Sequence, residues 1–181
     1  MKGVVFVELL AMAEEAFGED AVDEVIDNAD LQNGGSYTAV GNYPCEELVK
    51  IVEAFSAYSG LDADVLQRKF GHWMMGFFSR RYPEFFVGKS TAFEMLEAVD
   101  QEIHVEVLKL YPDAELPAFQ TERRGDGRLD MIYTSPRPLV PFCHGLIEAC
   151  VESFEEKATV TSVATPNTTN STTFTISVVG S

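Results

Sequence analysis

Hydrophobic positions recur at helical spacing through most of the first 112 residues. The opening segment 1–17 is apolar along one side, but Glu8 interrupts its apolar run. The segment therefore predicts an amphipathic helix rather than a signal peptide. A short acidic helix over 19–30 and a glycine- and asparagine-containing loop over 33–44 are expected to follow.

Three longer helices are predicted between that loop and Pro112. Pro44 begins the first of them, and the second begins near residues 62–64. The apolar stripe of the first consists of Leu48, Val52, Phe55 and Tyr58. Thr91 and Glu94 form a capping box that opens the third, which is expected to run unbroken to Pro112. Its apolar stripe consists of Phe93, Leu96, Val99, Ile103, Val107 and Leu110.

Beyond Pro117 the hydrophobic period changes to two, which is typical of strands. The predicted strands are 118–124, 128–135, 157–165 and 171–179. Gly125, Asp126 and Gly127 join the first two strands as a hairpin. A late helix over 140–155 separates the hairpin from the last two strands.

This order of elements predicts an α+β fold. A mainly helical part, 1–112, is followed by a part, 113–181, that holds a mainly antiparallel four-stranded sheet and the late helix. The length of 181 residues fits a single domain over 1–181.

Composition narrows the class of partner. The net charge of -16 argues against nucleic acid and against anionic membranes, since both require clustered Lys and Arg. It suits a soluble cytoplasmic protein or one that meets a basic surface on a partner. Cys45, Cys143 and Cys150 are odd in number and show no CxxC spacing, which favours a reducing compartment.

The stretch YTSPR places three carboxylate-binding side chains at alternate positions. In an extended segment Tyr133, Ser135 and Arg137 project to one side, and Pro136 restrains the residue before it. The guanidinium offers a planar fork of donors and the hydroxyls add two more. The three could hold two carboxylates of one ligand. The alternative is an ordinary strand end with a packed tyrosine and a solvated arginine.

His104 is the second candidate. It stands one helical turn after Asp100, which predicts a plain side-chain pair. A single histidine with no further ligands at metal spacing also suits one chemistry, namely axial ligation of iron already held by a porphyrin. His72 and His144 have the same ordinary interpretation as surface or packed histidines.

Together these features resemble the heme-nitric oxide/oxygen-binding (H-NOX) family, which also supplies the heme sensor of soluble guanylate cyclase. The resemblance covers nearly the whole chain. It includes the opening MKGVVFVEL, the histidine in DQEIHVEVLKLYPDAELP, the Y-x-S-x-R motif and the late FCHGLIEA segment. The combination of that histidine with Y-x-S-x-R is specific, whereas either one alone is weak.

The resemblance implies an enclosed heme pocket with assigned residues. His104 would be the proximal iron ligand, and Tyr133, Ser135 and Arg137 would bind the two heme propionates. Pro117 would press on the porphyrin and set its distortion. The chain lacks a CxxCH motif, so the heme would be non-covalent heme b. The implied distal wall consists of Val5, Leu9, Met74, Phe78, Phe142 and Leu146.

The resemblance further implies a bacterial gas sensor rather than an enzyme. Relatives that hold oxygen stably have a tyrosine where this chain has Phe142, so the prediction is binding of nitric oxide and carbon monoxide with discrimination against oxygen. Tyr111 is the side chain that could supply an unexpected hydrogen-bond donor. Signal transduction would pass to a separate protein, a histidine kinase or a cyclic-di-GMP enzyme.

Three alternatives remain open. A heme peroxidase would use His72 or His144 as its acid–base group and would need a polar distal side. A thiol-based or zinc-linked switch would use Cys143 and Cys150, but the chain offers few further ligands for zinc. A binding module for an apolar ligand would purify without the colour of heme.

Overall fold

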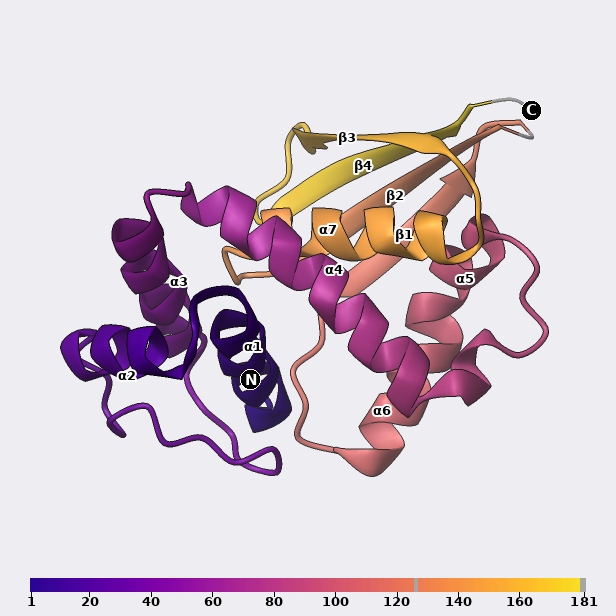
Figure 1. Cartoon of the computed structure of the whole chain (residues 1–181). Coiled ribbons are helices and arrows are strands. Elements are labelled where there is room, and N and C mark those ends of the chain that lie inside the picture. The colour runs from indigo at the N-terminus through magenta and orange to yellow at the C-terminus, as the bar shows by residue number, and fades with distance from the viewer. Residues whose placement is uncertain (126, 180–181) are drawn as a thin grey trace.

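Most helices precede the strands along the chain and one helix lies between the second and third strands, as Figure 1 shows for the computed structural model, which describes residues 1–125 and 127–179. The helices are α1 (Gly3–Phe17), α2 (Glu19–Asn28), α3 (Cys45–Ser59), α4 (Ala63–Arg81), the 3-10 helix η1 (Pro83–Phe86), α5 (Ala92–Ala98), the π-helical turn η2 (Val99–Ile103), α6 (His104–Leu110) and α7 (Val140–Ser153). The strands are β1 (Ala118–Arg123), β2 (Arg128–Thr134), β3 (Ala158–Ala164) and β4 (Ser171–Val178). The predicted α+β fold, with a four-stranded antiparallel sheet and a late helix, is confirmed.

The sheet has the order β1-β2-β4-β3, and every neighbouring pair is antiparallel. Burial alternates along β2, where Leu129, Met131 and Tyr133 face the covered side. Helix α7 lies along that side, and the long helix α4 crosses α7 (Figure 1). The hairpin prediction is confirmed by the pairing of Arg123 with Leu129, while Asp126 lies outside the described residues.

Two clusters of buried side chains form the core. The sheet cluster consists of Met75, Ala92, Phe93, Met95, Leu96, Leu129, Met131, Tyr133, Cys143, Ile147, Cys150, Val151, Phe174 and Ile176. The helix cluster consists of Phe6, Leu9, Ala13, Val22, Val25, Leu48, Ile51, Val52, Phe55, Leu66, Phe70, Met74 and Leu139. Leu146 on α7 packs against both clusters, so the helical and sheet-containing parts meet at this helix.

The predicted helix that ends before Pro112 is confirmed as a continuous helical run from Ala92 to Leu110. The run is not α-helical throughout, because a π-helical turn separates α5 from α6 and ends directly before His104. Two positions of the predicted apolar stripes are not buried, since Tyr58 is 49% exposed and Leu110 is 62% exposed. The capping box is confirmed, since Thr91 Oγ1 accepts a hydrogen bond from the backbone N–H of Glu94 at 3.2 Å.

The start of α1 is held by the loop that precedes α3. The Gly3 N–H donates to the carbonyl of Gly41 at 2.7 Å, and the Met1 amine donates to the carbonyl of Tyr43 at 2.8 Å. A Cβ atom at position 3 would lie 1.8 Å from the carbonyl oxygen of Thr38, so only glycine permits this approach. Residues 1–3 are therefore held against the loop that precedes α3.

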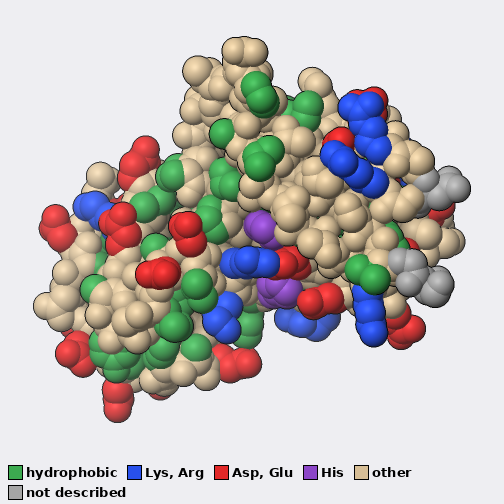
Figure 2. All heavy atoms as spheres, turned by 90° about the horizontal axis from the view of Figure 1, so that it is seen from above, with side chains coloured by type: hydrophobic (Ala, Val, Ile, Leu, Met, Phe, Trp, Pro, Cys, Tyr) green, Lys and Arg blue, Asp and Glu red, His purple; other side chains and the backbone are tan. Residues whose placement is uncertain are grey.

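Negative charge is concentrated in the helices that open the chain. The residues before Ala63 include 13 acidic and 2 basic side chains. Figure 2 shows acidic side chains around the lobe on the left of the view, and basic and histidine side chains gathered near its centre. Within the described part of the chain, no helix combines the length and apolar character that a membrane crossing demands.

Candidate functional site

His104 is the first residue of α6 and follows the π turn directly. Its side chain is 15% exposed, and its Nδ1 lies 3.5 Å from Asp100 Oδ1. Burial lowers the pKa of the His104 imidazole, although the Asp100 carboxylate partly opposes this shift. The ring is therefore neutral near pH 7 and keeps one nitrogen lone pair, which a metal ligand requires. The predicted contact with Asp100 is present.

Tyr133 and Ser135 lie at the end of β2, and both are buried. The strand ends at Thr134 and the chain bends over 136–138, so the prediction that Arg137 continues the extended segment is wrong. A turn instead holds Arg137 close to Ser135, because Ser135 Oγ accepts a hydrogen bond from the Arg137 N–H at 3.2 Å. Burial raises the pKa of Tyr133, which keeps its hydroxyl protonated as a donor.

Arg137 is held by the segment that leads into β1. Its Nη1 donates to the carbonyl of Glu115 and its Nη2 to Oε2 of the same residue, both at 2.7 Å. The arginine side chain is 16% exposed, whereas that of Glu115 is 86% exposed. Pro117, half-buried, ends this segment one residue before Ala118, which pairs with Thr134. Pro117 is thus next to the Y-x-S-x-R turn.

Aromatic contacts connect the histidine with the Y-x-S-x-R motif. Phe119 pairs with Tyr133 across β1 and β2, and their ring centroids are 5.6 Å apart. The centroid of the His104 ring is 5.7 Å from that of Phe119. The structure therefore brings the two candidate sites to one region, and Phe119 is a residue that the sequence pattern did not single out.

The residues predicted for the distal wall all belong to or pack on the helix cluster. Leu9 and Met74 are buried, while the other four are half-buried. The ring of Phe142 lies 5.1 Å from that of Phe70. These side chains from α1, α4 and α7 are apolar, so they offer van der Waals contact and no hydrogen bond to a small ligand.

A polar bridge joins the end of α6 to the N-terminus. Lys2 Nζ lies 2.8 Å from Asp113 Oδ1, and Asn42 Nδ2 lies 2.7 Å from Asp113 Oδ2. The Lys2 ammonium also lies 5.1 Å from the ring centre of Tyr111. The helix that carries His104 is thereby tied to the segment that leads into α1.

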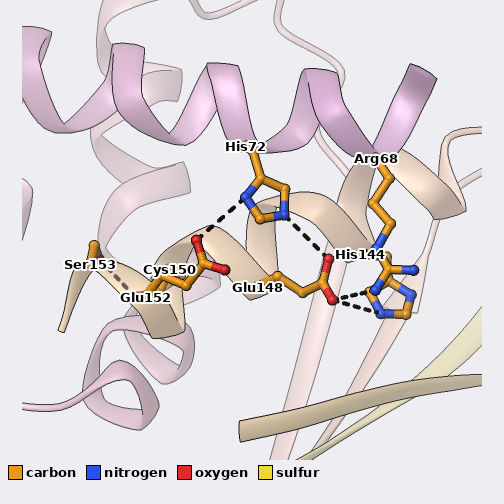
Figure 3. Close-up of polar contacts among 7 residues, drawn as sticks. All are labelled: Arg68, His72, His144, Glu148, Cys150, Glu152 and Ser153. Atoms are coloured by element: carbon orange, nitrogen blue, oxygen red, sulfur yellow. Dashed lines mark hydrogen bonds and ion pairs between the residues drawn. The ribbon is translucent and has the colours of Figure 1, made fainter. Parts of the chain in front are cut away.

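His72 and His144 belong to a different group on α4 and α7 (Figure 3). His72 Nε2 lies 3.3 Å from Glu148 Oε2, and His144 Nε2 lies 3.8 Å from Oε1 of the same carboxylate. Arg68 donates to both oxygens of Glu148. Figure 3 shows both imidazoles turned toward acidic side chains of α7. An acid–base role for His72 would therefore compete with these contacts, whereas His144 Nε2 is buried and has no hydrogen-bond partner among the described residues.

The cysteines considered for a thiol switch are buried on α7. Burial raises the pKa of Cys143, and it raises that of Cys150 to about 12. Both are thus held as thiols, the unreactive form. Among the described residues, no group of three or more His, Cys, Asp or Glu side chains is placed to hold a bare metal ion.

This set of donors fits heme. A neutral, half-buried imidazole suits a single axial iron ligand, and two hydroxyls with a guanidinium suit the carboxylates of propionates. The apolar residues of the helix cluster and the aromatic rings of Phe119 and Tyr133 are side chains that suit contact with a flat macrocycle. The fit rests on residue chemistry and on the contacts that bring Phe119, Tyr133 and His104 together.

Comparison with known proteins agrees with this chemistry. Residues 2–162 match the family model for haem-NO-binding domains. No curated protein matches the chain.

Solved structures are similar over almost the whole length. An unliganded ferrous H-NOX protein from K. algicida, the A71G mutant, is 32% identical, with a TM-score of 0.92 over 99% of this chain and 97% of that one. The IWP-051-bound, CO-ligated H-NOX from Shewanella woodyi is 35% identical, with a TM-score of 0.83 over 98% and 94%. An NO-ligated H-NOX protein from S. oneidensis shares the fold at 20% identity, with a TM-score of 0.89 over 99% and 100%. The chain belongs to the haem-NO-binding (H-NOX) family.

Proposed function

We propose that residues 1–181 form a single sensor domain for nitric oxide and carbon monoxide that uses non-covalent heme b and discriminates against oxygen. H-NOX domains bind heme and act as gas-binding sensors rather than enzymes. The observation that carries the assignment to this chain is the placement of the His104 ring one aromatic ring, that of Phe119, away from the buried Tyr133.

His104 would be the proximal ligand, through the nitrogen that does not face Asp100. Tyr133, Ser135 and Arg137 would hold the propionates, with Pro117 against the macrocycle. Ferrous heme supplies an open coordination position for a diatomic gas. The protein's share is to keep the imidazole neutral, to neutralise the propionate charge and to exclude water with the helix cluster.

Discrimination against oxygen would follow from the apolar residues of α1, α4 and α7. Oxygen held on ferrous iron carries partial negative charge and gains about 1.5–3 kcal/mol from a hydrogen-bond donor. The side chains assigned to the distal wall supply none, which lowers oxygen affinity by roughly one to two powers of ten. Nitric oxide and carbon monoxide depend far less on such a donor.

Signalling would pass through the connection between α6 and the N-terminal segment. Lys2 and Asn42 both contact Asp113, so a shift of the helix that begins at His104 reaches α1 directly. The output would be read in the cytoplasm by a separate protein, a histidine kinase or a cyclic-di-GMP enzyme. The acidic helices before Ala63 would favour a basic surface on that partner.

Absorption spectra of the purified, reduced protein test the proposal. Distinct Soret bands are expected without ligand, with nitric oxide and with carbon monoxide, and air should give no stable oxygenated spectrum. A stable oxygenated species would refute the discrimination. A protein that stays colourless when hemin is supplied would refute heme binding altogether.

A further inference from the structure

Asp100 lies in the π-helical turn and makes two contacts with one oxygen atom. Its Oδ1 lies 3.5 Å from His104 Nδ1 and accepts a hydrogen bond from the backbone N–H of Phe119 at 3.2 Å. One carboxylate oxygen thus touches both the candidate iron ligand and strand β1. We propose that Asp100 is a positioning residue that fixes the orientation and tautomer of the His104 ring. This inference rests on the proposed heme-binding function.

The direction of the contact decides which nitrogen remains free. A carboxylate only accepts hydrogen bonds, so the nitrogen of His104 that faces Asp100 has to carry the hydrogen. That nitrogen is Nδ1, which leaves the lone pair on Nε2. A carboxylate on the far nitrogen also makes an imidazole a more basic and hence stronger ligand.

The hydrogen bond to Phe119 determines where the ring is held. It joins the carboxylate to β1, and β1 is paired with β2 directly beside Tyr133. The Phe119 ring, in turn, lies 5.7 Å from the His104 ring and 5.6 Å from the Tyr133 ring, centroid to centroid. Asp100 thus connects His104 to the sheet that carries the propionate-binding motif, in addition to the connection through its own helix.

The π turn holds Asp100 and ends immediately before His104, so the helix has one wider turn at this point. Within that turn Asp100 lies between the histidine and the strand. Glu102 lies in the same turn, but its Oε2 pairs with Lys89 Nζ at 2.6 Å rather than with the histidine. It is therefore a suitable acidic control for Asp100.

The partial exposure of Asp100 limits how strongly its loss should weaken heme binding. The Asp100 side chain is 42% exposed and lines a hollow of about 340 Å³ together with Phe119 and Gln120. Loss of a buried partner of a metal ligand lowers metal affinity by about 10–100-fold, and screening by water places Asp100 near the lower end.

The test compares Asp100→Ala, Asp100→Asn and the control Glu102→Gln in heme-loaded protein. The readouts are the iron–histidine stretching band of the reduced, unliganded protein and the rate of heme transfer to an apoprotein acceptor. Asp100→Ala should lower the frequency of the band and speed heme loss by about tenfold. Asp100→Asn should fall between Asp100→Ala and the wild type, because its amide is a weaker acceptor. The control should match the wild type.

Each result has one meaning. A band position and transfer rate that are unchanged in both Asp100 variants would overturn the inference and leave heme binding intact. Equal changes in the Asp100 variants and in Glu102→Gln would overturn it as well, since the effect would not belong to the histidine contact. Wild-type protein without any iron–histidine band would refute the proposed ligand and this inference together. Asp100→Asn, which preserves shape, decides the matter if the alanine variant does not fold.

Discussion

Glu115 accepts hydrogen bonds from the guanidinium of Arg137, the group that the proposed function assigns to a heme propionate. Arg137 donates to the Glu115 carboxylate and carbonyl, both at 2.7 Å. Glu115→Gln removes the competing charge and keeps the carbonyl contact. We therefore expect this variant to retain heme more strongly than the wild type does.

The exposure of the Arg137–Glu115 pair determines how much slower heme dissociation should become. Because the Glu115 side chain is 86% exposed, the ion pair is worth only about 0.2–1 kcal/mol. That range corresponds to heme dissociation slowed by about 1.4- to 5-fold. Arg137→Gln should have the opposite and larger effect, since loss of a charged hydrogen bond costs about 1.5–3 kcal/mol, or roughly 10- to 100-fold faster loss.

Transfer of heme from the ferric protein to excess apoprotein acceptor, followed by absorbance, measures both variants. Glu122→Gln is the matched control, because this exposed residue on β1 changes the net charge equally and pairs with Arg124 instead. The difference between Glu115→Gln and the control should shrink at high salt. Faster heme loss from Glu115→Gln than from the control would show that Glu115 positions Arg137 rather than competing for it, and the reasoning would be wrong.

Three further predictions follow from other contacts. Phe142→Tyr should slow oxygen dissociation by about 10- to 100-fold through one added donor, with little change for nitric oxide, and stopped-flow traces without slowing would contradict the apolar-pocket account. Burial and the Arg68 guanidinium lower the pKa of His144 below its ordinary value of 6.5. The unfolded chain therefore binds the proton more readily than the folded protein, so the free energy of unfolding falls as the pH drops below 6.5. The urea midpoint should fall more steeply over that range for wild type than for His144→Gln. Thr91→Ala should destabilise the protein by about 1 kcal/mol, because the cap on the Glu94 N–H is lost, and an unchanged urea midpoint would count against that cap.

Much of the fold could be predicted because it depends on local periodicity. The change from helical spacing to period two near Pro117 marks the point where helices give way to the sheet, and the observed β1 and β2 follow it. The π turn could not be predicted in the same way. Val99 and Ile103 are four residues apart, and that spacing suits both an α-helix and a wider turn.

The candidate site was predictable only in part, for a related reason. His104 and Asp100 are one turn apart, so their contact follows from spacing. Arg137 returns to the site through a turn rather than along the strand, because Ser135 accepts its N–H. The contacts of Glu115 with Arg137 and of Phe119 with His104 depend on tertiary packing, which no period along the chain encodes.

The central claim is that His104 holds heme iron. The most direct measurement is the absorption spectrum of reduced His104→Gly protein, purified with and without imidazole. The account predicts loss of the heme band without imidazole and recovery of the wild-type five-coordinate spectrum when imidazole fills the space left by the side chain. A variant that keeps the wild-type spectrum in the absence of imidazole would contradict it.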